Sequence, residues 1–366
     1  MLNIKILYEF LCRMNYSKTL ISWYLQNKRD LPWRHTSDPY FIWLSETILQ
    51  QTRISQGLDY YIKFVQNYPK IEKLAAAPLD EVLKLWQGLG YYSRARNLHI
   101  TAQHIHNQYK GMFPQSYNEL LKLKGIGPYT AAAVASIAFD QPVAAIDGNV
   151  YRVLSRYFGI SLPTDSTQGK KYFTELANKL LDKKEPGVFN QALMEFGALQ
   201  CIPVNPGCGE CPFQSSCAAF EKGIVHKLPV KQKKPKQTNR YFNYLVILKN
   251  NYTYIMQRNN KDIWHSLYQF PLIETAKETA LPDLMKHKAW NQLFENAGDL
   301  TIGNISESYR HILSHQRIYA RFIKVLLDEN SSFPGIDMKV VPLPEVSIYA
   351  VPRLIEKYLL ESDLIS

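Results

Sequence analysis

Four of the chain's five cysteines lie in one short stretch and could together hold a metal centre. They are Cys201, Cys208, Cys211 and Cys217, spaced C-x6-C-x2-C-x5-C. Thiolates this close in sequence can form a soft sulfur cage, which favours an iron–sulfur cluster or zinc. Zinc sites built from two C-x2-C pairs have a different spacing. Two disulfides are the alternative, but we expect no secretory leader and the chain is too long to need such cross-links.

A glutamate on an apolar helix face is a candidate proton donor. If 39–51 form a helix, Glu46 lies on the same face as Ile42 and Leu49. A carboxyl group that is shielded from water has a raised pKa and suits proton donation near neutral pH. The alternative is a glutamate at the edge of the stripe whose carboxylate reaches water.

A second carboxylate, Asp147, precedes the predicted helix Val150–Tyr157. It could simply be the N-cap of that helix. The functional alternative is a carboxylate that the donors at the helix start keep ionised and that faces an electron-poor sugar carbon. One protonated and one ionised carboxyl group form the arrangement that breaks glycosidic bonds.

A glycine-containing loop joins two predicted helices, Tyr117–Leu123 and Tyr129–Phe139. Gly125 and Gly127 allow a tight turn, and Pro128 can begin the second helix. The exposed N–H groups at that helix start could bind an anion such as a DNA phosphate. The alternative is an ordinary helical hairpin with small residues for close packing.

The composition and charge limit the class of protein. A chain of 366 residues, 46% of them hydrophobic, can form two domains with separate cores. A net charge of +11 and a pI near 9.2 indicate a polyanionic partner, most simply nucleic acid, unless they reflect general basicity. No apolar run reaches the ~20 residues of a membrane span. We therefore expect a soluble intracellular protein, with Cys12 as an ordinary core residue.

The spacing of apolar residues changes along the chain and predicts its organisation. Residues 1 to about 225 show helical spacing. The basic stretch 226–240 has too few apolar residues to pack and is predicted to be a linker. Beyond it, β-branched and aromatic runs predict strands at 241–249, 252–258 and 318–327, with helices at 282–296 and 351–361. The expected fold is a mostly α N-terminal region followed by a smaller α/β domain.

Taken in order, these motifs resemble one family closely and over nearly the whole chain. The ordered set is 32–34 (PWR), 43–52 (WLSETILQQT), 88–92 (GLGYY), the hairpin, 147–150 (DGNV) and the four cysteines. It resembles the adenine DNA glycosylases of the MutY type, which belong with endonuclease III to the helix-hairpin-helix glycosylase superfamily. The resemblance implies a glycosylase domain at 1–225, built as a six-helix barrel with an iron–sulfur subdomain. Within it the hairpin spans about 117–139 and the cluster loop 201–217, and a Nudix-like domain at 241–366 would recognise 8-oxoguanine.

The resemblance also implies a reaction. The partner would be duplex DNA containing adenine opposite 8-oxoguanine or guanine, and the adenine would be flipped out of the stack. Glu46 matches the acid that protonates the leaving adenine, and Asp147 the carboxylate that stabilises the oxocarbenium-like sugar. Tyr129 matches a pocket residue that assists, and Asn149 is expected to orient Asp147 or the water. The product would be an abasic site, made by a monomer in the bacterial cytosol.

Further residues receive roles from the same resemblance. Arg34 lies in the part that lines the adenine pocket, while Gln51 and Tyr91 match side chains inserted into the duplex. The four cysteines would hold one [4Fe–4S] cluster, which takes no part in the hydrolysis.

In the C-terminal region, the segment 310–315 (RHILSH) resembles the loop that probes 8-oxoguanine. Ser314 and His315 match, whereas Leu313 stands where the family has an aromatic residue; it offers no ring for a stacking contact but could still act as a wedge. The glutamate-rich helix that binds metal in Nudix hydrolases is missing. We therefore expect a recognition module without nucleotide hydrolysis.

Tyr129 also separates two activities. Endonuclease III relatives carry a lysine there, whose amine attacks the sugar and leads to strand cleavage, whereas a phenol forms no Schiff base. The sequence thus predicts a monofunctional enzyme. The alternatives are a bifunctional endonuclease III-like enzyme acting on oxidised pyrimidines and a non-catalytic lesion-binding protein.

Overall fold

The computed structural model describes residues 2–232, 237–260, 262–295, 297–328, 331, 337–362 and 364, the first thirteen of these by backbone alone. Its contacts divide the chain into two compact units. The first comprises Met1–Ala76 and Asn97–Lys233, and the second comprises Ala77–Arg96 and Lys234–Ser366. The side chain of Cys12 and residues 233–236 of the predicted linker lie outside the described residues.

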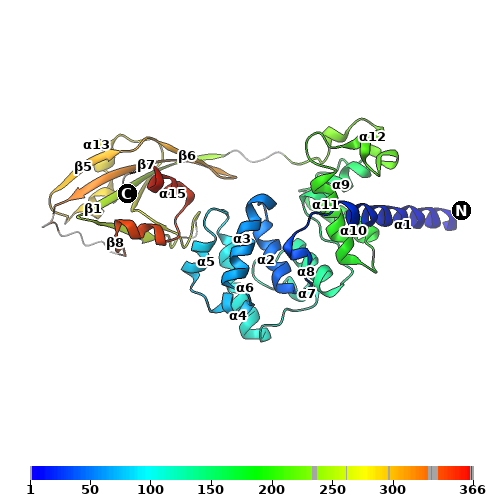
Figure 1. The fold of residues 1–366 in the computed structure, drawn as a ribbon. Coiled ribbons are helices and arrows are strands. Elements are labelled where there is room, and N and C mark those ends of the chain that lie inside the picture. The colour runs from blue at the N-terminus through cyan, green and yellow to red at the C-terminus, as the bar shows by residue number, and fades with distance from the viewer. Residues whose placement is uncertain are drawn as a thin grey trace. The chain divides into compact units, whose positions relative to one another are not determined.

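The N-terminal two-thirds of the chain are helical, as the spacing of apolar residues predicts (Figure 1). The helices are α1 (Leu2–Asn27), α2 (Pro39–Leu49), α3 (Ile54–Asn67), α4 (Ile71–Ala76), α5 (Leu79–Leu85), α6 (Ser93–Tyr109), α7 (Tyr117–Leu120), α8 (Pro128–Phe139), α9 (Gly148–Tyr157), α10 (Thr167–Leu180), α11 (Pro186–Leu199) and α12 (Ala218–Glu221). Short 3-10 turns lie at Pro32–Arg34, Cys208–Glu210, Gln214–Ser216 and Val225–Lys227.

Two helices of the first unit, α8 and α11, form its packing centre. Helix α8 contacts α2 and α11, and α11 also contacts α1 and α9 (Figure 1). The residues from Thr130 to Ser136 in α8 are all buried, and four of them are alanines, which let the neighbouring helices approach closely. A separate apolar core gathers side chains of α1, α9, α10 and α11, among them Leu20, Leu154, Phe173, Phe189 and Leu193.

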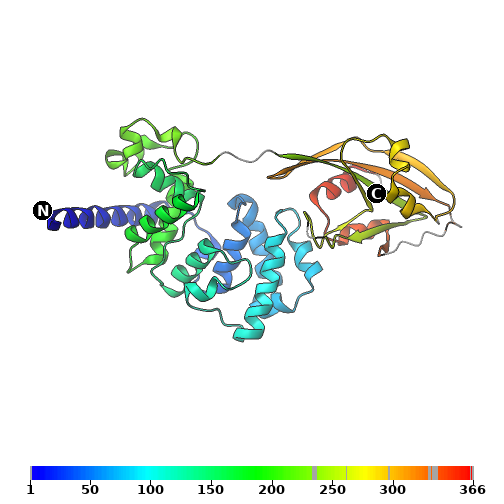
Figure 2. The same cartoon turned by 180° about the vertical axis from the view of Figure 1, so that it is seen from behind.

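The second unit contains a mixed sheet. In its described part the strands are β1 (Thr238–Lys249), β2 (Tyr252–Gln257), β3 (Tyr268–Gln269), β4 (Leu272–Thr275), β5 (Leu300–Ile305), β6 (Tyr309–Ile312), β7 (Gln316–Leu327) and β8 (Lys339–Pro342). The order is β3-β2-β1-β7-β5, with β4 on β1, β6 on β7 and β8 on β2. The long strands β1 and β7 pair in parallel, with Tyr244 opposite Phe322 (yellow-green and orange in Figure 2).

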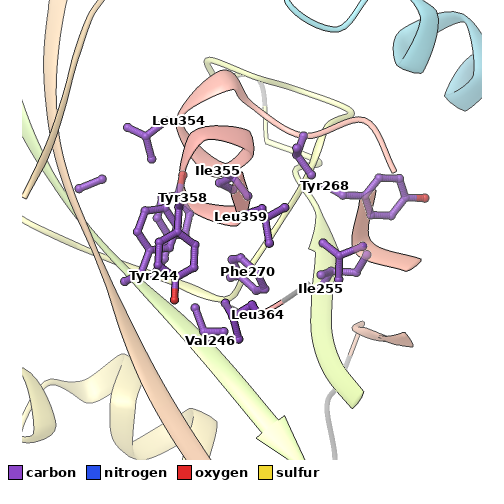
Figure 3. Packing of buried hydrophobic residues seen from close by; sticks show 14 of the residues in the cluster. Tyr244, Val246, Ile255, Tyr268, Phe270, Leu354, Ile355, Tyr358, Leu359 and Leu364 are labelled. Atoms are coloured by element: carbon purple, nitrogen blue, oxygen red, sulfur yellow. The ribbon is translucent and has the colours of Figure 1, made fainter. Parts of the chain in front are cut away.

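Helices cover both faces of this sheet. One face of β1 carries Phe242, Tyr244 and Val246, which pack with Phe322 and with α15 (Arg353–Glu361) (Figure 3). Tyr358 of α15 stacks on Phe322 with ring centroids 3.8 Å apart. The other face packs against α13 (Leu281–Met285) and α14 (Lys288–Phe294). This two-sided burial explains why β1 is buried continuously from Phe242 to Ile247 rather than at every second residue.

Several predicted boundaries need correction. The helix predicted at 282–296 is two helices, separated at Lys286 and His287, because the His287 ring accepts a hydrogen bond from the backbone N–H of Ala289 and caps α14. Helix α2 ends at Leu49, two residues earlier than predicted, and Gln51 has a φ of +57°. Strand β1 begins at Thr238, inside the predicted linker. Among the described residues, no helix is both long enough and apolar enough to span a bilayer.

Candidate active site

A cleft of about 1370 Å³ in the first unit brings together most of the predicted site residues. Its walls come from α2, the turn after α2, the start of α8, the start of α9 and one face of α11. The predicted residues that line it are Arg34, Glu46, Gln51, Gly125, Gly127, Tyr129, Asp147 and Asn149. The two carboxylates on which the predicted chemistry depends therefore open onto one cavity.

Glu46 is held on the apolar face of α2. The helix begins with Asp38 as its N-cap, whose carboxylate accepts from the backbone N–H of Tyr40, and with Pro39 at its first position. The pKa of Glu46 is raised to about 7, mainly by burial and in part by the negative charge of Asp147, while the charge of Arg34 acts in the opposite direction. The hydroxyl of Tyr129 opposes this shift by donating to Glu46 Oε2 at 2.5 Å. A carboxyl group with a pKa near 7 can hold a proton at working pH and release it to a substrate.

Asp147 is both the N-cap of α9 and a wall of the cleft, so the two interpretations of this residue are compatible. The backbone N–H of Val150 donates to its Oδ1 at 2.8 Å, and Asn149 Nδ2 donates to its Oδ2 at 2.7 Å. Burial raises the pKa of Asp147, while these donors and the charge of Arg152 lower it. Asp147 is therefore less strongly ionised than the sequence predicts, but it has the donors that stabilise its charged form.

Asn149 is positioned by the two helices around it. Arg152 donates from Nη2 to Asn149 Oδ1 at 2.7 Å and to the Gly197 carbonyl at 2.6 Å. A Cβ atom at Gly197 would lie 2.6 Å from the Asn149 Cβ, so only glycine lets α11 approach this loop. The amide that contacts Asp147 is thus oriented by α9 and α11 together.

Sequence reasoning missed a third carboxylate, Glu195. Its side chain on α11 is buried and lines the cleft beside Arg34. Arg34 donates to both carboxylate oxygens at 2.9 and 2.7 Å, and Arg29 does so at 2.9 and 2.5 Å. These hydrogen bonds lower the pKa of Glu195 to about 2 although burial opposes the shift. The sequence does contain a signal for this residue, since Glu195 interrupts an otherwise apolar stretch of α11.

The hairpin loop has the predicted form with one difference. Gly125 has a φ of +76°, and a Cβ atom there would lie 2.5 Å from the Cβ of Asn97, so this position requires glycine. Gly127 has an ordinary φ of −88° and open space around it. Pro128 begins α8, as predicted, and the loop at Lys124–Pro128 is exposed apart from the buried Ile126. The N–H groups at the start of α8 are therefore open to an anion.

The residues predicted to enter DNA have strained backbones. Gln51 and Tyr91 are exposed and have φ values of +57° and +47°, which L residues rarely adopt. Such strain is common at functional sites. Tyr91 belongs to the second unit, where its hydroxyl lies 3.0 Å from Ser314 Oγ.

The predicted probe loop is the turn between β6 and β7. The backbone N–H of Leu313 donates to the Gln316 carbonyl at 2.8 Å and closes the turn. Ser314 and His315 are exposed at its tip, whereas Leu313 is partly buried and packs against the core of the second unit. Ile312, which precedes it, is 56% exposed. The apolar side chain presented at this turn is therefore Ile312 rather than Leu313.

No disulfide joins the four clustered cysteines, which argues against the two-disulfide alternative. They line one small cavity together with Arg156, Tyr157, Phe196 and Phe213. In the part of the chain that the structure describes, no group of three or more His, Cys, Asp or Glu side chains is arranged to hold a single metal ion.

The chemistry of this donor set fits a cationic occupant. Burial and the neighbouring thiols raise the pKa of Cys211 to about 11, so that its thiolate needs a positive partner. The buried Arg156 guanidinium supplies positive charge to other thiols of the set, since its Nη1 lies 3.5 Å from Cys201 Sγ and its charge lowers the pKa of Cys208. The Tyr16 hydroxyl is buried nearby and finds no hydrogen-bond partner among the described residues. An iron–sulfur core would supply both positive charge and sulfur acceptors.

The helical fold and the cleft with its two carboxyl groups indicate a DNA glycosylase of base excision repair, and comparison with known proteins confirms this class. Residues 44–183 match the family model of the HhH-GPD superfamily base excision DNA repair protein, and residues 243–361 match the NUDIX domain model. A solved thermostable thymine-DNA glycosylase is 34% identical, with a TM-score of 0.53, over 57% of this chain and 97% of that one. A trapped endonuclease III–DNA covalent intermediate, 23% identical with a TM-score of 0.50, has the same helical fold.

Among curated proteins the similarity extends over most of the chain. The adenine DNA glycosylase of Buchnera aphidicola subsp. Baizongia pistaciae is 35% identical over 327 residues, which cover 87% of this chain and 88% of that protein. The adenine DNA glycosylase of Mus musculus is 44% identical over 226 residues, 58% of this chain and 44% of the mouse protein. The chain belongs to the adenine DNA glycosylase family, as the sequence motifs predict.

Proposed function

We propose that the protein is a monofunctional DNA glycosylase that hydrolyses the N-glycosidic bond of adenine mispaired with 8-oxoguanine or guanine in duplex DNA. The observation that carries this proposal is the cleft in which Glu46, with a pKa raised to about 7, faces the hydrogen-bonded carboxylate of Asp147. Family membership supports adenine as the base. We further propose that the enzyme acts in the bacterial cytosol and as a monomer, a state that the common origin of Glu46, Tyr129 and Asp147 in one chain supports.

The reaction divides between the two carboxyl groups. Protonated Glu46 gives its proton to a ring nitrogen of the extruded adenine, the C1′–N9 bond breaks, and its electron pair leaves with the base. Asp147, held by Val150 and Asn149, stabilises the positive charge that develops on the sugar. Water then adds to C1′ and gives a proton to the Glu46 carboxylate, which restores the acid and leaves an abasic site. Tyr129 has no amine and gives no strand cleavage.

Other residues in the proposal bind the nucleic acid and the cofactor. The exposed amides at the start of α8, with Gly125 and Gly127, would bind a DNA phosphate. Arg34 would line the adenine pocket, Gln51 and Tyr91 would enter the base stack, and Ser314 and His315 would probe the opposite base. Cys201, Cys208, Cys211 and Cys217 would hold one [4Fe–4S] cluster, which in this protein organises the loop and leaves the hydrolysis to the carboxyl groups.

One assay separates the proposal from its alternatives. Duplexes containing a single A·8-oxoguanine, A·G, A·T or thymine-glycol site are incubated with the protein, and the products are analysed with and without hot alkali. Cleavage that requires alkali and occurs only at mispaired adenine supports the proposal. Cleavage without alkali at the oxidised pyrimidine would support an endonuclease III-like enzyme. Tight binding with neither product would support a non-catalytic lesion binder.

A further inference from the structure

A thioether lies beside the hydroxyl that contacts the proposed acid. Met194 Sδ on α11 is 3.1 Å from the Tyr129 hydroxyl oxygen, which is also 2.5 Å from Glu46 Oε2. All three side chains line the cleft. A phenol has one proton, so it can donate to the carboxyl group or to the sulfur but not fully to both.

The choice between these two acceptors depends on the charge of Glu46. An ionised carboxylate is a much stronger acceptor than a thioether, so the hydroxyl then donates to Glu46. A protonated carboxyl group is a weaker acceptor, and the sulfur then gives the hydroxyl a second partner. The other charged groups that face Glu46 are Asp147 and Arg34, and Glu195 neutralises Arg34. None of these groups offers the hydroxyl a hydrogen bond within the described residues.

We propose that Met194 is a positioning residue whose sulfur accepts a hydrogen bond from the Tyr129 hydroxyl whenever Glu46 is protonated, and thereby favours the acid form of Glu46. This inference rests on the proposed role of Glu46 as the proton donor. The sulfur never contacts the substrate in this scheme. It acts by giving Tyr129 an alternative to the carboxyl group, which leaves the Glu46 proton available to the extruded base.

The proposal predicts opposite effects for two small substitutions. Met194→Leu keeps the volume and apolar packing but removes the acceptor, so the protonated form of Glu46 loses stability and its pKa falls. Tyr129→Phe removes the donor that stabilises the carboxylate, so the pKa of Glu46 rises. In the Tyr129→Phe background, Met194→Leu should cause no further shift, because the hydroxyl through which the sulfur acts is gone.

The test is the pH profile of adenine release under single-turnover conditions for the four proteins. In Met194→Leu we expect the pH at which the rate falls on the alkaline side to be lower by about half a unit. The rate should then fall about threefold at pH values above this midpoint and change little at pH values below it. The same midpoint should lie at higher pH in Tyr129→Phe. A uniform loss of rate without a shift, or an equal shift in the Tyr129→Phe background, would overturn the inference.

A second readout does not depend on catalysis. The carboxyl stretching band that Glu46→Gln removes from the infrared spectrum can be titrated in the unsubstituted protein and in Met194→Leu. The midpoint should be lower in Met194→Leu, and equal midpoints would reject the role of Met194. A shifted midpoint in a protein that releases no adenine would reject the proposed function and keep the Met194 contact. Circular dichroism and thermal unfolding confirm that each variant is folded before it is compared.

Discussion

Two glutamates in the same cleft, Glu46 on α2 and Glu195 on α11, have opposite acidities. Both are carboxyl groups on largely apolar helix faces, and burial raises the pKa of each. The neighbours decide the outcome. Glu46 has one neutral donor, Tyr129, and a pKa of about 7, whereas Glu195 has two arginines and a pKa of about 2. Burial alone therefore does not identify an acid, because the counter-charge determines which carboxyl group keeps its proton.

The largest expected effect comes from removing the protonated member of the pair. Glu46→Gln keeps the shape of the side chain and has no proton to give, so base release should fall by roughly 100- to 10,000-fold. Single-turnover release of adenine from an A·8-oxoguanine duplex measures this loss. Binding of the same duplex should remain close to normal, and full turnover by the variant would show that Glu46 is not the acid.

Glu195, the ionised glutamate of the pair, should contribute mainly to the stability of the fold. Glu195→Gln leaves two guanidinium groups without their counter-charge, which for a buried pair costs about 3–5 kcal/mol of the free energy of unfolding. Chemical denaturation at neutral pH measures this loss in the free energy of unfolding. Glu195→Asp, which keeps the charge, is the matched control and should lose less. Equal losses in both variants would indicate that packing, not charge, holds the two arginines.

Glu46 should also make stability depend on pH in a particular direction. The folded pKa of about 7 lies above the ordinary 4.5, so the contribution of this group is full below pH 4.5 and is lost as pH rises through 7. Glu46→Gln should therefore stabilise the fold at pH 8, by on the order of 2 kcal/mol, and hardly at pH 5. Chemical denaturation of both proteins from pH 5 to pH 8 measures this difference in the free energy of unfolding. A variant that gains more stability at pH 5 than at pH 8 would contradict the prediction.

The smallest effect is expected from a conservative change of Arg29, the more exposed of the two arginines that contact Glu195. Arg29 is 34% exposed at its side chain, whereas Arg34 is 12% exposed. Arg29→Lys keeps the charge but loses the two-pronged contact with Glu195, which should cost about 1 kcal/mol and leave base release unchanged. Arg34→Lys is the comparison variant and should impair release as well. Equal losses of stability and of base release in Arg29→Lys and Arg34→Lys would show that the two arginines do not have different roles.

The sequence was sufficient where the signal is local. The spacing of the cysteines, the apolar face around Glu46 and the cap position of Asp147 all depend on residues within a few turns. In the structure the cysteines line one cavity, Glu46 lies on α2 and Asp147 caps α9. Glu195 was missed because its partners, Arg29 and Arg34, lie 166 and 161 residues away. The early end of α2 and the orientation of Leu313 were missed for the same reason, since tertiary packing decides them.

One turn of α11 serves three parts of the cleft at once. Met194 contacts the hydroxyl beside the acid, Glu195 holds the arginines, and Gly197 makes room for Asn149 beside Asp147. Helices move as rigid rods more readily than they deform, so a small rotation of this helix would alter proton supply, base recognition and sugar stabilisation together. The orientation of α11 therefore affects the whole cleft. A substitution elsewhere on α11 that tilts the helix would weaken proton supply, base recognition and sugar stabilisation in parallel.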